Sequence, residues 1–387
     1  MDPDELEDHE VSRLNYRGNL ATYSKRSGWA LCIGAGASSP FFPDWNELAS
    51  SLFHKTSGPR FKKVDVESFV KTYGAAPAIQ AAAEFHQSAE KLHGESSPFP
   101  DLVSESLYEG LKRDVESLPG PWKWELLESK ALSSASPRTF PSPKTWKVFV
   151  DRLETVANRP KNKNHASSAF GIAEAVAEVA DTERRPQAIL SFNAETLLFA
   201  LINAFYAQGK NSKAYSLSGH RPVVRMVHEL SQRQSGQIPF FHIHGLVPIP
   251  GQTNAFERSI SNEKLIFSEG QYLSLSNRAY SWQSTNFLSI CLNHRCVFAG
   301  VSFTDPNLRR WLAWQQESRI QERRSKKLRE HRYQHFWFKK HSNAGRGKLT
   351  NEQKLIQASV DHLGVRVIWI KDYPEIGERL KEMLEPS

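Results

Sequence analysis

Three kinds of residue suited to phosphate binding and proton transfer follow short apolar runs in this chain. The run at 29–33 leads into Gly34–Gly36, and Ser38 comes two residues later. Because glycine has no Cβ, such a turn lets a phosphate approach the backbone N–H groups closely. Asn193 and His244 each follow another apolar run. An asparagine amide both donates and accepts hydrogen bonds, and imidazole exchanges a proton near neutral pH. The pattern indicates a site for a phosphorylated ligand, such as a dinucleotide, beside a proton acceptor.

The elements that must position these residues have the pattern of a parallel α/β sheet. Strands are predicted at 29–33, 187–192, 223–230, around His242 and Cys296, at 335–338 and at 365–370. The polar residues stand at the C-terminal ends of these apolar strands. In an open parallel sheet, ligands bind in the crevice outside those ends. We therefore expect Gly34–Ser38, Asn193, His244 and Gly300–Ser302 to converge on one crevice.

An ordered set of motifs resembles the sirtuin superfamily. The set is Gly-Ala-Gly-Ala-Ser at 34–38, Pro-Asp-Trp at 43–45, Phe-Asn-Ala-Glu at 192–195, His-Gly at 244–245 and Gly-Val-Ser at 300–302. The resemblance runs from about residue 28 to about 370, with a long unmatched stretch between about 54 and 186. The stretch from Gly300 to Arg309 looks most like divergent sirtuin-like proteins of bacteria. Those proteins mostly act as NAD-consuming effectors in anti-phage defence.

The resemblance implies a Rossmann-like parallel sheet flanked by helices, with a mostly helical small domain inserted into it. We expect an acidic tail and helix at 1–27 and a sirtuin-like domain at 28–387. The core of that domain comprises about 28–53 and 186–387, and the insertion comprises about 54–185. Helical patterns separated by loops rich in Pro and Ser fit this insertion.

The resemblance makes Asn193 and His244 the catalytic residues and NAD+ the substrate. Cleavage of the nicotinamide–ribose bond passes through an oxocarbenium-like centre, and nicotinamide is already a cationic leaving group. A group that orients the ribose and the nucleophile is useful there, and so is a base. Asn193 suits the first role and His244 the second. We thus predict an NAD+ glycohydrolase that releases nicotinamide and ADP-ribose.

Each catalytic residue has a structural alternative. Asn193 stands where it would cap a helix that begins at Thr196. A single histidine on an apolar strand is more often a core residue bonded to a backbone carbonyl. His242 precedes His244 by two residues, and we expect it to be structural because the family's base directly precedes the glycine.

Further residues are carried over from the resemblance as nucleotide-binding residues: Gly34, Ala35, Gly36, Ser38, Pro43, Asp44, Trp45, Glu195, Gly300 and Ser302. The stretch at 43–45 matches one that closes over the nicotinamide side, although Asn46 replaces the usual Arg. Glu195 stands where sirtuins place an Asp that holds the carboxamide. Gly300 and Ser302 match a stretch near the adenosine ribose.

Asp305 and Asn307 have a simpler explanation than ligand binding. They flank Pro306, and proline is favoured in the first turn of a helix. We therefore expect both residues to cap a helix that begins at Pro306.

The three cysteines argue against the zinc ribbon of deacetylase sirtuins. That ribbon uses two Cys-x-x-Cys pairs, and no such pair occurs among Cys32, Cys291 and Cys296. His294 lies between the last two, but structural zinc needs four ligands. We predict buried thiols, no metal and no disulfide.

The charge and hydropathy of the chain bear on its location in the cell and on whether it binds nucleic acid. The net charge of +8 comes partly from residues 309–348, which include Arg323 and Arg324. Contact of this segment with nucleic acid is an alternative, but a solvated face or an acidic partner is favoured. The acidic N-terminus has no signal-peptide pattern, and no apolar run reaches the ~20 residues that span a bilayer. We expect a cytoplasmic protein without a membrane contact.

Regulation is expected to come from assembly, because the sheet and its insertion occupy nearly the whole chain. We expect a homo-oligomer and a partner protein, in the first place a HerA-like hexameric ATPase and otherwise a short Argonaute. Two other functions stay open. One is an NAD-dependent protein deacylase or ADP-ribosyltransferase, and the other is a nucleotide-binding or DNA-acting module.

Overall fold

The computed structural model describes residue 20 and residues 28–93, 98–119, 142–159, 167–209, 213, 216, 221–227, 236–247, 250, 265–278, 280–326, 333–342, 344 and 349–385. The predicted tail and helix at 1–27 lie outside these residues, apart from Leu20.

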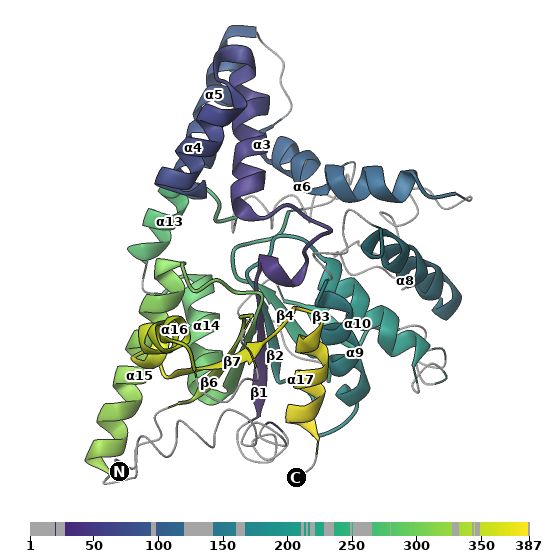
Figure 1. Cartoon of the computed structure of the whole chain (residues 1–387), viewed down its shortest axis with the longest axis vertical. Coiled ribbons are helices and arrows are strands. Elements are labelled where there is room, and N and C mark those ends of the chain that lie inside the picture. The colour runs from purple at the N-terminus through teal and green to yellow at the C-terminus, as the bar shows by residue number, and fades with distance from the viewer. Residues whose placement is uncertain are drawn as a thin grey trace.

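A seven-stranded sheet forms the centre of the molecule (Figure 1). Its strands are β1 (Trp29–Ile33), β2 (Ala188–Ser191), β3 (Val224–Met226), β4 (Ile238–His242), β5 (Arg295–Ala299), β6 (His335–Lys340) and β7 (Val365–Ile370). They lie in the order β3-β4-β2-β1-β5-β6-β7, and every neighbouring pair is parallel. The predicted α/β class is confirmed. The strand expected at 223–230 is shorter, and residues 228–230 of it lie outside the described residues.

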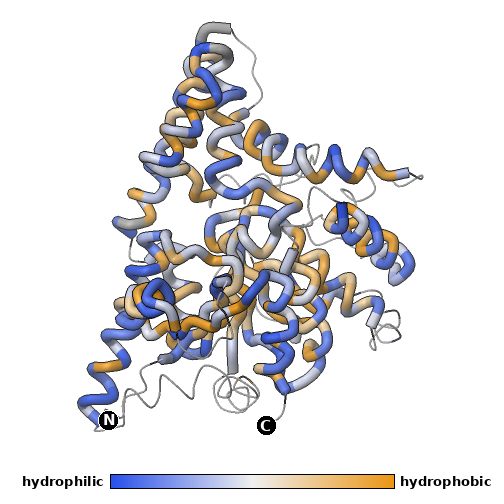
Figure 2. Tube along the Cα trace, viewed as in Figure 1, coloured by the Kyte–Doolittle hydropathy of each residue, from blue (hydrophilic) through white to orange (hydrophobic). Residues whose placement is uncertain are grey.

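Helices cover both faces of the sheet, so the strands are buried on each side. In β1, Trp29, Leu31 and Ile33 belong to one apolar cluster. Ala30 and Cys32 belong to the other cluster. The first cluster includes α9 (Ala169–Val179), α10 (Leu197–Gln208) and α17 (Glu375–Leu384). The second includes α14 (Trp282–Asn293), α15 (Pro306–Ser325) and α16 (Asn351–Asp361). Figure 2 shows hydrophobic residues gathered around the sheet.

The described residues of 54–185 form helices and no strand. Helices α3 (Trp45–Ser57), α4 (Lys63–Tyr73) and α5 (Ala75–His93) project at the top of Figure 1. The next two, α6 (Phe99–Glu116) and α8 (Pro143–Ala157), lie beside the sheet. In contrast, α9 packs directly against α10 and α17 in the layer that covers the sheet. The division into core and insertion stays a prediction.

The strand order changes direction at β1, which lies between β2 and β5. Strands β2 to β4 lie on one side of β1, and strands β5 to β7 lie on the other. At this point the turns after β1 and β5 touch. Gly34 N donates to Ala299 O at 3.0 Å, and Gly36 N donates to Gly300 O at 3.1 Å. Gly300 has φ +67°, and a Cβ there would lie 2.3 Å from Ala37 N. Glycine is therefore required at position 300 by both conformation and space.

The described helices include none that is both long and apolar enough to cross a lipid bilayer.

Candidate active site

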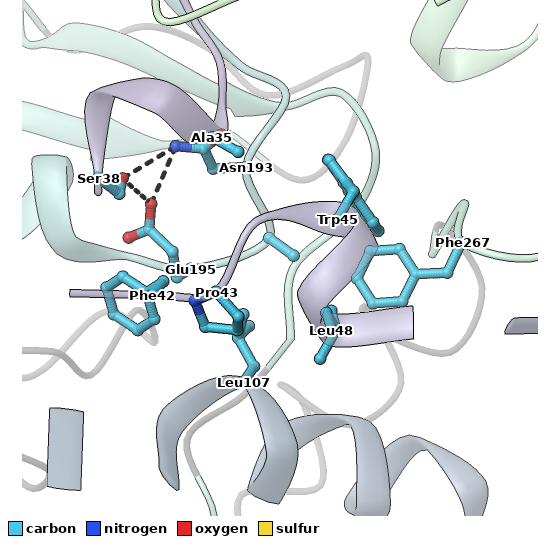
Figure 3. A pocket seen from close by; sticks show the side chains of 11 residues that line it. Ala35, Ser38, Phe42, Pro43, Trp45, Leu48, Leu107, Asn193, Glu195 and Phe267 are labelled. Atoms are coloured by element: carbon cyan, nitrogen blue, oxygen red, sulfur yellow. Dashed lines mark hydrogen bonds between the residues drawn. The ribbon is translucent and has the colours of Figure 1, made fainter. Parts of the chain in front are cut away.

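A pocket opens at the carboxyl edge of the sheet, between the turn after β1, the segment after β2 and the start of α3 (Figure 3). Six predicted residues line it: Ala35, Ser38, Pro43, Trp45, Asn193 and Glu195. The remaining lining residues are apolar: Phe42, Leu48, Leu107, Ala194 and Phe267. The pocket is thus apolar except for one polar cluster, which is the usual composition of a small-molecule site.

That cluster consists of Ser38, Asn193 and Glu195, and all three side chains are buried. Asn193 Nδ2 donates to Ser38 Oγ at 3.0 Å and to Glu195 Oε1 at 3.0 Å. Ser38 Oγ also donates to Glu195 Oε1 (Figure 3). These bonds join the turn after β1 to the segment after β2, so the two predicted motifs meet.

Asn193 has one unsatisfied acceptor. Its side chain is 4 % exposed, and Oδ1 has no hydrogen-bond partner among the described residues. A buried acceptor left without a partner is unfavourable by about 1–3 kcal/mol. Because Asn193 lines the pocket, a ligand that offers an O–H or N–H group would satisfy this oxygen.

The backbone of Asn193 is fixed from two sides. Asn193 N donates to Ser191 Oγ at 3.1 Å, and Asn193 O lies 2.8 Å from His242 Nδ1. His242 therefore holds a backbone carbonyl, in keeping with the structural role expected for it. The capping alternative for Asn193 is wrong, since its side chain bonds to Ser38 and Glu195. The N–H of Leu197 is instead accepted by Glu195 Oε2.

Burial dominates the electrostatics of Glu195. Loss of solvent around the carboxyl group raises its pKa, although hydrogen bonds from Ser38, Leu197 and Asn193 oppose this effect. The raised pKa makes protonation of Glu195 easier than that of an exposed glutamate.

His244 lies just beyond β4 and not on the strand, because β4 ends at His242. The chain turns at Gly245, which has φ +86°. The His244 side chain is 3 % exposed and contacts the rings of Trp45, Phe192 and Tyr272. Trp45 also lines the pocket, so His244 contacts a residue of the pocket wall. His244 itself does not line the pocket.

The sequence did not predict that Asp305 contacts a catalytic candidate. As expected, it caps α15: Oδ1 accepts from Asn307 N at 2.8 Å. Its second oxygen, Oδ2, lies 3.1 Å from His244 Nε2. The cap was readable from the Asp-Pro sequence, whereas the contact with His244 depends on the path of the chain between β5 and α15.

Five predicted binding residues do not line the pocket, namely Gly34, Gly36, Asp44, Gly300 and Ser302. Asp44 is exposed, and its carboxylate caps α3 by accepting from Asn46 N and Glu47 N. Ser302 is also exposed, and its hydroxyl lies 2.7 Å from Thr304 Oγ1. A role for either residue in binding a nucleotide stays a prediction.

The glycine turn offers fewer amides than the sequence indicated. Four of the five amides in Gly34–Ser38 already donate to backbone carbonyls, namely those of Gly34, Gly36, Ala37 and Ser38. Within the described part of the chain, only the Ala35 amide lacks such a partner. Few N–H groups of this turn are therefore left for a phosphate, because β5 and the turn itself supply the acceptors. Gly34 serves the close packing of the two turns, since a Cβ there would lie 2.6 Å from Gly300 O.

The cysteines form a buried group below this edge. Cys291 Sγ and Cys296 Sγ are 3.3 Å apart, and Cys32 hydrogen-bonds Cys296 as well. Burial raises the pKa of Cys32 and of Cys291. All three are free thiols. The described residues contain no cluster of His, Cys, Asp and Glu arranged to hold a metal ion.

A comparison with protein families finds a match within the second half of the chain. Residues 203–366 match the SIR2-like domain. The match supports a place in the sirtuin-like superfamily and an NAD-related function, since SIR2-like domains use NAD+ as a substrate. A comparison with curated proteins gives no match.

The SIR2-like match includes His244, Gly300 and Asp305, whereas Ser38 and Asn193 precede it. The two halves of the site are nevertheless joined in space. Trp45 contacts His244 and lines the same pocket as Asn193.

Proposed function

We propose that this protein is an NAD+ hydrolase that cleaves the nicotinamide–ribose bond to give nicotinamide and ADP-ribose. The observation that carries the proposal is the polar cluster of Ser38, Asn193 and Glu195 at one end of an apolar pocket. Asn193 Oδ1 needs a donor there, and a carboxamide or a ribose hydroxyl has one. The apolar walls suit a flat aromatic ring.

The chain's own residues have distinct tasks in this proposal. Asn193 orients the ribose and the attacking water, because its amide is locked by Ser38 and Glu195. His244 takes the proton that the water loses as it bonds to the anomeric carbon. The nicotinamide leaves with the electron pair of the broken bond, so it needs no acid. The apolar rings around His244 keep bulk water away from the base.

The biological role that we propose is depletion of NAD+ as an effector of bacterial anti-phage defence. Its support is the resemblance of Gly300–Arg309 to divergent bacterial sirtuin-like proteins. In the same proposal, a partner such as a HerA-like hexameric ATPase controls the activity.

The direct test is incubation of the purified protein with NAD+ and chromatographic measurement of nicotinamide and ADP-ribose. A parallel reaction contains an acetyl-lysine peptide. We expect equal amounts of both products, unchanged by the peptide. Formation of an acetylated ADP-ribose would instead show a deacylase, and release of neither product would refute the proposed activity.

The catalytic assignment is tested with a matched pair of histidine variants. His244→Ala is expected to reduce the turnover of NAD+ by about 10²-fold or more, the usual contribution of a general base. His242→Ala is the control and should have a smaller effect, because His242 Nδ1 lies beside the backbone carbonyl of Asn193 and not beside its side-chain amide. Near-normal turnover by folded His244→Ala would remove His244 from the mechanism.

A further inference from the structure

Asp305 performs two tasks with its two carboxylate oxygens. Oδ1 accepts from Asn307 N at 2.8 Å and so caps α15. Oδ2 is not needed for the cap and lies 3.1 Å from His244 Nε2. A capping residue is usually turned to solvent, but the side chain of Asp305 is only 18 % exposed.

We propose that Asp305 is the positioning residue of His244, holding the imidazole as the Nε2–H tautomer and leaving Nδ1 as the proton acceptor. Among the described residues neither Nε2 nor Oδ2 makes a hydrogen bond of good geometry, and a carboxylate can only accept one, so its negative charge favours a proton on the nitrogen that faces it. The lone pair of the neutral ring then lies on Nδ1. The catalytic consequence rests on the proposed function, whereas the tautomer itself does not.

The charge of Asp305 supports this arrangement. Burial alone would raise the pKa of its carboxyl group, but the neighbouring His244 and the two capping N–H groups lower it overall. Asp305 is therefore ionised at neutral pH. The neighbouring Arg309 does not compete for it, since that guanidinium donates to Phe303 O and Ser359 O.

The surroundings of His244 are otherwise almost free of titratable groups. Among the described residues, those that face it are Asp305 at the start of α15 and Tyr272 on α13 (Glu269–Ser276). Trp45 on α3 and Phe192 after β2 supply apolar contacts. Tyr272 Oη lies 3.5 Å from His244 Nδ1. Burial raises the pKa of Tyr272, so its hydroxyl keeps its proton at neutral pH, and in the proposed tautomer it faces the lone pair of Nδ1.

The loop before Asp305 contains a residue in a strained backbone conformation. Phe303 has φ +60°, a conformation that is strained for a residue with a side chain. Its ring is buried against Phe298 and Trp337, which hold it there. Trp337 Nε1 also donates to Val301 O at 2.8 Å. This left-handed residue lies two positions before Asp305, in the loop that leads to the cap of α15 and to the contact with His244.

The tautomer can be measured without any substrate. We would record the imidazole nitrogen resonances of the ¹⁵N-histidine-labelled protein and assign His244 by their loss in His244→Gln. Wild type should show a protonated Nε2 and an unprotonated Nδ1. Asp305→Asn should change this pattern, because its amide can donate to Nε2. A wild-type His244 that carries its proton on Nδ1 would overturn the proposal.

The kinetic test uses Asp305→Asn, Asp305→Ser and Asp305→Glu. Asn and Ser cap helices about as well as Asp, so stability should change little. Both variants should lose about 10²-fold in kcat for nicotinamide release with KM for NAD+ nearly unchanged. The Glu variant should restore part of the rate.

The outcomes separate the two proposals. If wild type releases no nicotinamide, the proposed function fails while the nitrogen spectrum still decides the tautomer. If wild type is active and Asp305→Asn keeps its rate, Asp305 is a helix cap only. If Asp305→Asn fails to fold, Asp305→Ser distinguishes the two roles in the same way, because it keeps the cap and removes the contact with His244.

Discussion

At the residue scale, the buried Asn193 amide is the most informative feature of the site. Its nitrogen is satisfied by Ser38 and Glu195, whereas its oxygen is not satisfied within the described residues. The orientation of the amide is therefore fixed before any ligand arrives. Fixed dipoles of this kind stabilise a transition state without reorganising during the reaction.

This reasoning predicts the kinetic effect of Asn193→Ala. The variant should lower kcat for nicotinamide release by about 10²-fold while the Kd of NAD+ changes by only a few fold. Turnover and equilibrium binding measured on the same preparation would show this. Equal losses in both would make Asn193 a ground-state binding residue.

Glu195 makes a second prediction at this scale, on the pH dependence of stability. Because its pKa is raised in the folded protein, its contribution is fully present below the unfolded pKa of about 4.3. That contribution is lost as the pH rises through the raised, folded pKa. The melting temperature of Glu195→Gln relative to wild type should thus increase with pH across that window. A difference that stays constant with pH would contradict a raised pKa.

At the element scale, strand positions were predictable and the ends of strands were not. Parallel strands buried on both faces have continuous apolar runs, and these runs predicted β1, β2 and β7. His244 was expected on a strand because it follows Ile243, but β4 ends at His242 and the chain turns at Gly245.

Long-range pairing explains what else the sequence did not predict. Gly36 N donates to Gly300 O, and Asp305 Oδ2 lies beside His244. Both contacts join segments that are far apart in the chain. Motifs located Ser38, Asn193 and Glu195 at one crevice, because all three follow strand ends. They carried no information on which polar groups are already paired.

The contact between the two turns predicts a large effect of Gly300→Ala. The left-handed backbone alone costs about 1–2 kcal/mol for alanine, and the added Cβ would lie 2.3 Å from Ala37 N. We expect the free energy of unfolding to fall by about 2 kcal/mol or more, measured by urea denaturation. Gly110→Ala is the matched control: it lies within α6 with nothing within 4 Å of the new Cβ, so a gain of up to about 1 kcal/mol is expected. Similar effects of the two substitutions would show that the turns tolerate separation.

At the scale of the whole molecule, α15 connects the site to the surface. Its first turn holds Asp305 beside His244, while its last turn carries Arg323 and Arg324. Along the same helix, Trp311 is buried in the core, whereas Trp314 is 42 % exposed with Arg310 stacked over its ring. A partner that contacts α15 would therefore touch an element whose other end positions the proposed base.

This geometry sharpens the prediction that activity depends on assembly. Exposed Trp and Arg side chains are favoured anchors of protein interfaces, so we expect Trp314→Glu to weaken self-association or partner binding. Specific activity should rise with protein concentration in wild type, in parallel with the mass measured by light scattering, and should rise further with the partner. Trp314→Glu should need a higher concentration for the same activity, whereas Leu355→Glu, a substitution at another exposed apolar residue, should behave as wild type. A wild-type monomer with the same specific activity at every concentration, and no response to a partner, would place the control of this site within the single chain.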